Sequence, residues 1–338
     1  MIRYYGLIVT FLLVAAPLSV SSNVGTGAQV DHLIAAEDHL AEGQISPAIA
    51  KLKAALRVDP TDVDARYLLG TIYLFIAEGQ AAEIEFRAAI AAGMPTESVA
   101  QRLGEALLLQ RRYQDLLDEL PETAPDPYER AAIMALRGRA WAGLGQEDEA
   151  YGAYTQAETL APNSVAPKLG LVRLLVRSGD LAEAEKKVDE ALALEPDSRR
   201  ARLLKAELSR MQGRRADAVT VLNQLIGRSP HFVEALLARA TALIDLEEFE
   251  GASQDIEKAL TLNARHPMAF HLSATVLARQ GEYEEAYAVL DRAGRSLDSY
   301  GPSVFLRGLI TYSTNQQEQA VFYLGRLLEL APVDSWNM

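Results

Sequence analysis

The sequence predicts an all-α protein, built as a solenoid of about nine 34-residue helix-turn-helix units. Three observations support this fold class. Leu and Ala dominate the 338 residues, whereas the β-favouring Val and Thr are sparse. Small residues recur at a fixed spacing of 34 positions. Gly and Pro interrupt each period at the places where one helix turns into the next or has to stop.

The repeat is clearest in one column of small residues. Steps of 34 in both directions from Ala150 reach Ala at eight of nine positions: Ala48, Ala82, Leu116, Ala150, Ala184, Ala218, Ala252, Ala286 and Ala320. Four residues later stands a larger side chain, as in Phe86 and Tyr154, which we expect to fill the gap against the next unit. Since neither helix of a unit can bury its apolar face alone, the units are expected to stack.

Two further columns mark where helices end. Five residues before the Ala column a turn residue recurs, at Gly43, Gly145, Gly179, Gly213, Gly281 and Asn315. Twelve residues after it stands a proline, at Pro60, Pro162, Pro196, Pro230 and Pro332. Each unit is therefore predicted to be two helices joined by a Gly-containing turn and closed by a residue that cannot continue a helix.

The N-terminus has the order of a secretory signal peptide, which we assign to residues 1–28. Arg3 precedes an apolar stretch from Leu7 to Val20, and small and polar residues follow. This stretch contains Pro17 and is shorter than the roughly 20 residues of a spanning helix. Cleavage after Ser22 or Ala28 is expected, and an uncleaved anchor is the alternative. In both cases the rest of the chain is expected to be exported.

The remaining chain divides into units 1–3 (29–130), units 4–9 (131–334) and a tail (335–338). In the third unit the second helix, YQDLLDEL, runs into Pro121, Pro125 and Pro127, which end it early. This favours either a bend at that point or a locally remodelled repeat. After Pro332 only VDSWNM follows, without the polar capping helix of a terminal repeat. We interpret this as a truncated array, the alternative being a last helix covered by a partner or a second copy.

Composition and motifs argue against most kinds of chemistry. A formal net charge of −13 disfavours a general nucleic-acid binder. The absence of Cys excludes disulfides, thiolate metal sites and a lipidated Cys. There is no phosphate-binding loop and no G-x-S-x-G motif. The pairs His32/His39 and His266/His271 lack a third metal ligand nearby, and Glu147 to Glu149 complement a helix dipole. We expect no enzymatic activity, no metal and no cofactor.

Binding is the function class that remains. The first helix of every unit should line the concave surface of the solenoid. Its exposed positions predict a groove containing Tyr67, Arg139, Arg173, Arg177, Arg200, Arg210 and Arg279. Arginine suits bidentate capture of carboxylates, so an acidic peptide segment or an anionic polysaccharide is the expected partner. The alternative is that these arginines pair with Glu and Asp on adjacent helices.

The columns of small, large and Pro residues resemble the tetratricopeptide repeat (TPR). That resemblance implies a right-handed superhelical solenoid and protein partners. More narrowly, stretches such as AEDHLAEGQISPAIAKLKAALRVDP and HPMAFHLSATVLARQGEYEEAYAVL are similar to the TPR (lipo)proteins of exosortase/PEP-CTERM systems in Gram-negative bacteria. This implies a periplasmic scaffold for envelope protein sorting or exopolysaccharide assembly and export. This chain departs from the group in having no Cys for a lipid and in being shorter. The alternative function is a periplasmic chaperone or assembly factor for outer-membrane components.

Overall fold

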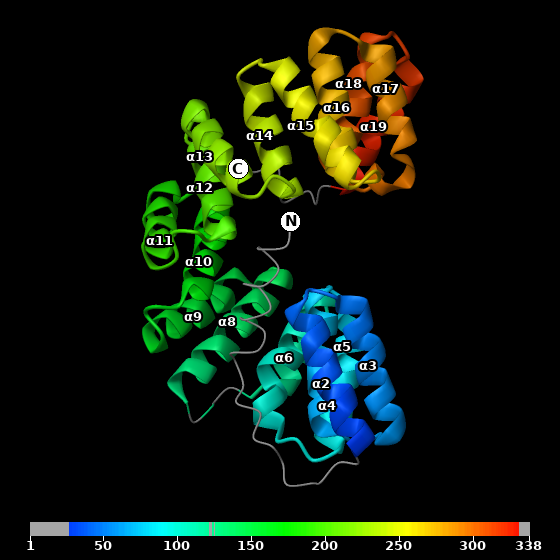
Figure 1. Cartoon of the computed structure of the whole chain (residues 1–338). Helices are drawn as coiled ribbons and strands as arrows, with labels where there is room; N and C mark the ends of the chain where they lie inside the picture. The colour runs from blue at the N-terminus through cyan, green and yellow to red at the C-terminus, as the bar shows by residue number, and fades with distance from the viewer. Residues whose placement is uncertain (1–26, 122–123, 125, 331–338) are drawn as a thin grey trace. The chain divides into compact units, whose positions relative to one another are not determined.

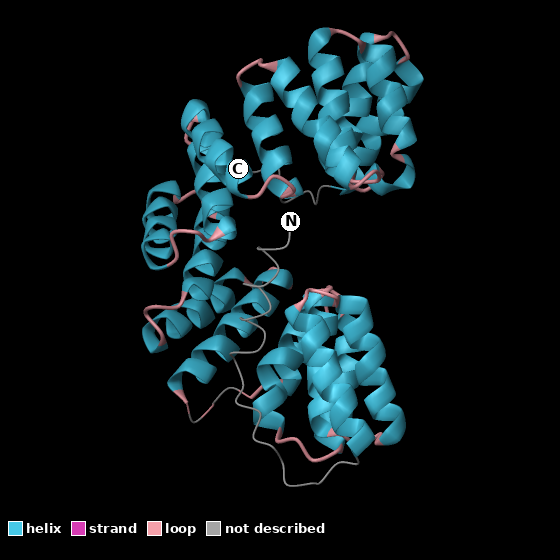
Figure 2. Cartoon of the chain, in the orientation of Figure 1, coloured by secondary structure: helices cyan, strands magenta, loops and turns pink. Residues whose placement is uncertain are grey.

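The computed structural model describes residues 27–121, 124 and 126–330, and this part of the chain consists of helices and short loops (Figures 1 and 2). It contains eighteen α-helices and one 3-10 helix, and no strand among the described residues. The predicted all-α class is confirmed. Residues 1–26 of the predicted signal peptide and the predicted tail at 335–338 lie outside the described residues. None of the described helices is both long and apolar enough to cross a membrane.

The helices form nine successive hairpins, which confirms the predicted number of units. The first five hairpins are α2 (Gly27–Ala41) with α3 (Ile45–Val58), α4 (Val63–Phe75) with α5 (Gly79–Ala91), α6 (Thr96–Leu109) with α7 (Tyr113–Glu119), α8 (Pro127–Gly143) with α9 (Glu147–Leu160), and α10 (Val165–Arg177) with α11 (Leu181–Leu194). The last four are α12 (Arg199–Met211) with α13 (Arg215–Arg228), α14 (Val233–Asp245) with α15 (Phe249–Leu262), α16 (Pro267–Gln280) with α17 (Tyr283–Arg292), and α18 (Gly301–Ser313) with α19 (Gln317–Leu330).

The turn inside each hairpin has the same backbone conformation in all nine units. The residue two positions before the second helix has a positive φ, between 57° and 87°, whether or not it is a glycine. Gly or Asn occupies this position in the six units where the sequence shows a turn residue. In the other three units it is Ala77, Arg111 or Glu247. A residue in this left-handed conformation ends the first helix and satisfies its last carbonyl groups. Because it occupies the same repeat position in every hairpin, the second helices begin 34 residues apart.

Two second helices are shorter than the rest. The early end predicted for the third unit is confirmed, since α7 stops at Glu119, just before Pro121. The eighth unit was not expected to differ. There α17 stops at Arg292, and a 3-10 helix, η1 (Gly294–Leu297), replaces its last turn. The other second helices have 13 or 14 residues.

The repeated small residues are packing contacts. All nine members of the Ala150 column are at most 3 % exposed. The large residue four positions later also packs inside its own hairpin: a Cβ on Gly70 would lie 2.7 Å from the Phe86 ring. Tyr154 contacts both neighbours, because its ring lies against Gly138 of its own hairpin and Gly170 of the next. For Tyr154 the expected filling of the gap to the next unit is confirmed, and the same side chain also fills space inside its own hairpin.

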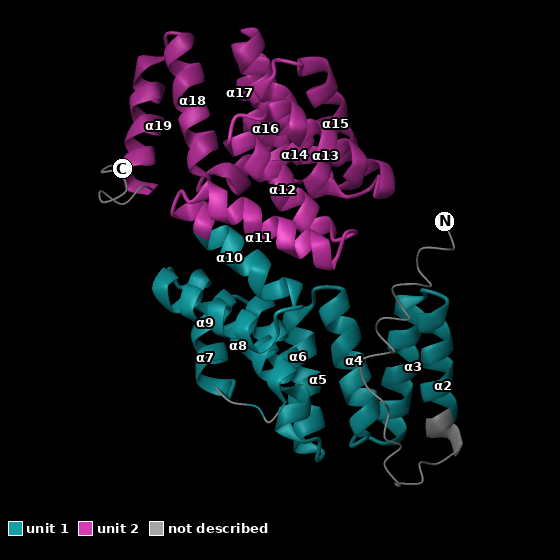
Figure 3. Ribbon diagram, turned by 90° about the vertical axis from the view of Figure 1, so that its left-hand side faces the viewer, with its two compact units in different colours: residues 1–174 teal, residues 175–338 magenta. Residues whose placement is uncertain are grey.

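The chain divides into two compact units, residues 1–174 and 175–338 (Figure 3). The predicted joint at 130/131 lies inside the first of them, where α8 packs on both α6 and α7. A bend at that joint stays a prediction. Within each unit the first helices of successive hairpins contact one another. In the first unit α4 packs on α6 and α6 on α8, and in the second α12 packs on α14, α14 on α16 and α16 on α18.

Candidate interaction surface

Helices α8 and α10 both pack closely against the Tyr154 side chain of α9. Glycine lacks a Cβ, so the backbones at Gly138 and Gly170 can both lie directly on the Tyr154 ring. Arg139 follows the first of these glycines, and Arg173 comes one turn of helix after the second. The two arginines stand 34 residues apart, at the same position of the first helix in neighbouring hairpins.

Arg139 and Arg173 are both exposed. Within the part of the chain that the structure describes, neither side chain forms a hydrogen bond or an ion pair. Two unpaired guanidinium groups on adjacent hairpins are available to a carboxylate-bearing partner. They are the members of the predicted groove that best fit its expected role.

Two other predicted groove residues form ion pairs with carboxylates of this chain. The Arg210 Nη1 atom lies 3.0 Å from Oδ2 of Asp245, on the first helix of the following hairpin. The Arg279 Nη2 atom lies 3.0 Å from Oε1 of Glu247, and its guanidinium also sits 5.9 Å from the centre of the Phe249 ring. For these two arginines the alternative interpretation, pairing with acidic residues of neighbouring helices, describes the structure.

The remaining predicted residues have partners as well. Arg177 and Arg200 are exposed, but each takes part in an interaction. Tyr67 is half-buried, with its ring centre 5.8 Å from that of Phe86. Its hydroxyl interacts with Arg102, whose Nη1 atom also lies 3.1 Å from Glu105 Oε2. Tyr67 thus belongs to a packed cluster on α4, α5 and α6. The structure does not show seven equally available groove residues.

The predicted residues also fall into both compact units. Arg139 and Arg173 belong to residues 1–174, together with Tyr67, whereas Arg177, Arg200, Arg210 and Arg279 belong to residues 175–338. The candidate surface is therefore defined on the first unit by α8 and α10.

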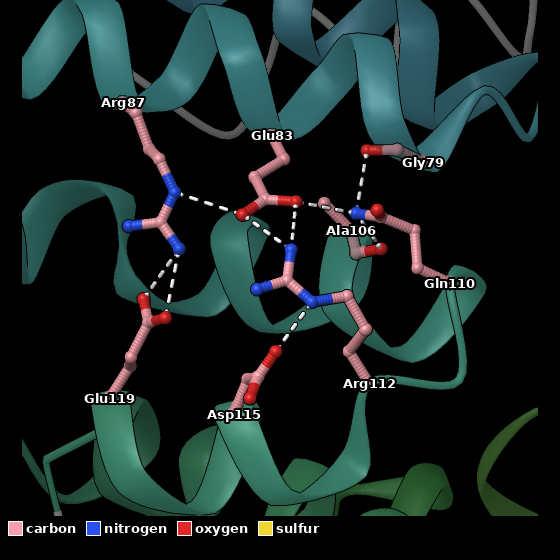
Figure 4. A network of polar contacts seen from close by, with 8 residues as sticks. All are labelled: Gly79, Glu83, Arg87, Ala106, Gln110, Arg112, Asp115 and Glu119. Carbon is pink, nitrogen blue, oxygen red and sulfur yellow. Dashed lines mark hydrogen bonds and ion pairs between the residues drawn. The ribbon is translucent and has the colours of Figure 1, made fainter.

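A network that the sequence reasoning missed joins the second and third hairpins (Figure 4). The Glu83 carboxylate on α5 is 7 % exposed and accepts hydrogen bonds from Gln110 Nε2 at 2.7 Å and from Arg112 Nη1 at 2.7 Å. Arg87 donates to Glu83 at 2.9 Å and to Glu119 at 2.7 Å. Burial opposes ionisation of Glu83, but these hydrogen bonds more than offset it and lower its pKa below the ordinary value.

The same arrangement recurs three units later. Glu185, Gln212 and Arg214 each follow Glu83, Gln110 and Arg112 by 102 residues, which is three repeats. Gln212 Nε2 donates to Glu185 at 3.0 Å, and Arg214 Nη2 donates to it at 2.7 Å. Comparison of the repeats for matching polar residues, in addition to small ones, could have found this device. Since all its charges are satisfied internally, it joins hairpins and offers no site for a ligand.

One histidine, His271, has structural partners. His271 lies on α16 with its Nδ1 2.9 Å from the Ser303 Oγ and its ring edge-on to Tyr300. Burial lowers the pKa of His271, so the ring is neutral at physiological pH. Among the described residues no group of three or more His, Cys, Asp or Glu side chains is arranged to hold a metal ion.

These features define a helical-repeat protein in which the first helices of successive hairpins stack on one another. A tetratricopeptide repeat family model matches residues 169–231 and 237–300, and a TPR repeat model matches residues 37–74. The chain is a tetratricopeptide repeat protein. Repeats of this kind generally form non-catalytic surfaces for protein interaction.

Curated relatives are distant. DnaJ homolog subfamily C member 3 from Gallus gallus is 24 % identical over 345 residues, covering 96 % of this chain and 64 % of the relative. The type IV pilus assembly protein PilF from Pseudomonas aeruginosa is 24 % identical over 153 residues, covering 45 % of this chain and 61 % of the relative. The chain thus spans less than two thirds of the length of these relatives.

Solved structures share the fold. Human IFIT1, in a dimer with m7Gppp-AAAA, is 17 % identical with a TM-score of 0.64, over 90 % of this chain and 77 % of that chain. Yeast Tom70 is 16 % identical with a TM-score of 0.57, over 96 % of this chain and 72 % of that chain. At such low identity the likeness concerns the fold alone. None of these relatives tests the narrower resemblance to exosortase/PEP-CTERM proteins.

Proposed function

We propose that this TPR protein is an exported, non-catalytic scaffold that captures acidic segments of partner proteins on the exposed faces of α8 and α10. The observation that carries the proposal is the pair Arg139 and Arg173, exposed and unpaired among the described residues and at matching positions of adjacent hairpins. Bidentate pairing of each guanidinium with a carboxylate gives both affinity and a fixed spacing between acidic residues of the partner.

The net charge of −13 makes local pairing essential for such a partner. An acidic segment is repelled by the chain as a whole and binds only where unpaired cations outweigh that repulsion. The repulsion also acts against weak, non-specific binding of acidic proteins. A scaffold with a strongly acidic surface and a small cationic site is thereby selective for segments that reach both arginines.

The cellular role that we propose is envelope protein sorting or exopolysaccharide assembly and export, in the periplasm of a Gram-negative bacterium. The signal-peptide-like order of residues 1–28 supports export, and the similarity to TPR proteins of exosortase/PEP-CTERM systems supports the role.

A second candidate is an assembly factor for outer-membrane components. The similarity to PilF, a protein whose name describes assembly of type IV pili, favours it. Both candidates use the same surface and differ in the partner. A partner from sorting or polysaccharide export supports the first, and an outer-membrane client supports the second.

The test is crosslinked affinity capture of the exported protein from its own host, with bound proteins and glycans identified by mass spectrometry. We expect Arg139→Ala/Arg173→Ala to reduce recovery of an acidic protein partner about tenfold or more, since each charge-assisted pair contributes roughly 1.5 to 3 kcal/mol. The matched control is Arg57→Ala/Arg215→Ala, which removes the same charge from exposed positions on the second helices α3 and α13.

Equal recovery by the wild-type protein and the Arg139/Arg173 variant contradicts a role of these arginines. Recovery of an anionic polysaccharide in place of a protein, lost in the same variant, contradicts the choice of a protein segment as the partner.

A further inference from the structure

The eighth hairpin departs from the repeat in a way that opens a cavity. Because α17 ends at Arg292 and the chain continues as the short η1, the usual last helical turn is missing beside α18 and α19. A cavity of about 390 Å³ lies there, lined by side chains from α17, η1, α18 and α19. This volume is at the small end of the range for small-molecule sites.

One wall of the cavity is a fixed, buried arginine. Arg307 is 9 % exposed and donates to Asp298 Oδ1 at 3.0 Å and to the Leu290 carbonyl oxygen at 2.7 Å. Its guanidinium also lies 5.8 Å from the centre of the Tyr323 ring. The Tyr323 hydroxyl is in turn 2.9 Å from the Tyr287 hydroxyl. These contacts hold the wall in one geometry before any ligand arrives.

Two further arginines of the lining have unused donors. Arg295 is exposed and, within the described residues, its side chain has no hydrogen bond or ion pair. Arg326 uses only its Nε, which donates to the Asp298 carbonyl oxygen at 3.2 Å. No described carboxylate pairs with either of them. Both are therefore free to bind an anion.

The charge balance and the aromatic wall define that anion more closely. Three arginines and two aspartates, Asp291 and Asp298, line the cavity, so its side chains carry a net charge of +1. This suits a monoanion better than a dianionic phosphate, which the two aspartates repel. Phe322 is 63 % exposed beside the cavity and stands edge-on to Tyr323, 5.3 Å away. Such a surface stabilises an apolar group attached to the anion.

We propose that this cavity is a binding site for a carboxylate that carries an aromatic or aliphatic group. Arg295 and Arg326 bind the carboxylate, and the apolar part packs on Phe322. The carboxylate comes either from a free small acid or from the C-terminus of a peptide. This site goes beyond the scaffold function, because it lies on different hairpins from Arg139 and Arg173 and does not depend on them.

The first test is calorimetric titration of the full-length protein with hippurate, an aromatic monocarboxylate, and with acetyl-Ala-Ala-Phe bearing a free C-terminal carboxylate. The two probes distinguish a free acid from a peptide terminus, and binding of either supports the site. Their amides, hippuramide and acetyl-Ala-Ala-Phe amide, are expected not to bind. Inorganic phosphate is expected to compete poorly, and equal competition by phosphate contradicts the assignment of a monocarboxylate.

Variants locate the binding. Arg295→Gln and Arg326→Gln are each expected to weaken binding about tenfold, as loss of a charge-assisted hydrogen bond does. Arg292→Gln is the matched control, because Arg292 is an exposed arginine at the end of α17 that does not line the cavity. Its affinity should equal that of the wild-type protein. The proposal is overturned if neither carboxylate binds, or if Arg295→Gln, which removes no internal contact, leaves the affinity unchanged.

Discussion

At the scale of the residue, the contact between Tyr154 and two glycines shows how strictly this repeat depends on a missing Cβ. A Cβ on Gly170 would lie 2.3 Å from the Tyr154 ring, and one on Gly138 would lie 2.8 Å from it. Gly170→Ala is therefore expected to destabilise the protein by roughly 1 to 3 kcal/mol, the usual cost of overpacking a filled core. The midpoint of urea unfolding, followed by circular dichroism, measures this change.

Gly152→Ala provides the control for that variant. Gly152 lies on α9, two residues before Tyr154, and a Cβ there would meet nothing within 4 Å. In the interior of a helix Ala is more stable than Gly by about 0.5 to 1 kcal/mol, so this variant should be more stable than the wild-type protein. Equal destabilisation by both variants would mean that an added methyl group is costly in α9 and α10 whether or not it meets the Tyr154 ring, and the contact with Tyr154 would not be the cause.

The turn residues show what sequence reasoning captures at this scale and what it does not. Glycine at Gly43 or Gly145 announces a positive φ, because glycine adopts it without steric cost. Ala77 and Glu247 have the same conformation, with φ of 60° and 63°, although their side chains disfavour it. The requirement comes from the two packed helices on either side, and only the 34-residue period indicates it in the sequence.

At the scale of the element, polar networks determine how one hairpin is attached to the next. Glu185 on α11 accepts hydrogen bonds from Lys205 on α12 at 2.8 Å and from Arg214 at 2.7 Å. These hydrogen bonds lower the pKa of Glu185 from 4.5 to about 2. In the unfolded chain the pKa returns to about 4.5. The ionised carboxylate therefore stabilises the folded state above pH 4.5, and this stabilisation is lost as the pH falls towards 2.

This linkage gives a prediction for the Glu185→Gln variant. Near pH 6 it should be less stable than the wild-type protein by about 1 kcal/mol, and the difference should shrink as the pH is lowered to 2.5. Urea midpoints measured from pH 2.5 to pH 6 report it. Glu195→Gln, at the exposed end of the same helix, is the matched control. A difference for Glu185→Gln that is independent of pH would exclude the ionised carboxylate as its source.

The candidate binding surface was only partly predictable for a reason that belongs to this scale. The repeat tells which positions of a first helix face outward, and Arg139 and Arg173 are indeed exposed. It does not tell which outward residues meet. Arg210 and Asp245 stand 35 residues apart, in different columns, and they pair because α12 and α14 pack side by side. Such pairs depend on the packing of helices, which no single column of the repeat describes.

At the scale of the whole molecule, contacts join each hairpin to its neighbours in the sequence. Helices of the first unit pack as α4 on α5, α5 on α6 and α6 on α8, and the second unit continues in the same manner from α11 to α19. In such an array stability is approximately a sum of local terms. The 34-residue period predicts this architecture, whereas the division at 174/175 has no equally plain signal, because it falls inside the regular helix α10.

The local character of the stability can be tested with two matched core variants. Phe86 and Leu222 occupy the same repeat position, one in each of the two compact units, and each is at most 1 % exposed. Replacement of either by Ala should cost about 2 to 5 kcal/mol. Hydrogen exchange measured by mass spectrometry should show Phe86→Ala losing protection in α4 to α6, with α14 to α16 unchanged, and Leu222→Ala should show the loss in α12 to α14, with α4 to α6 unchanged. If either variant lost hydrogen-exchange protection equally in all helices, the array would unfold as one cooperative body. Interactions between neighbouring hairpins alone would confine the effect of one side chain to the hairpins near it.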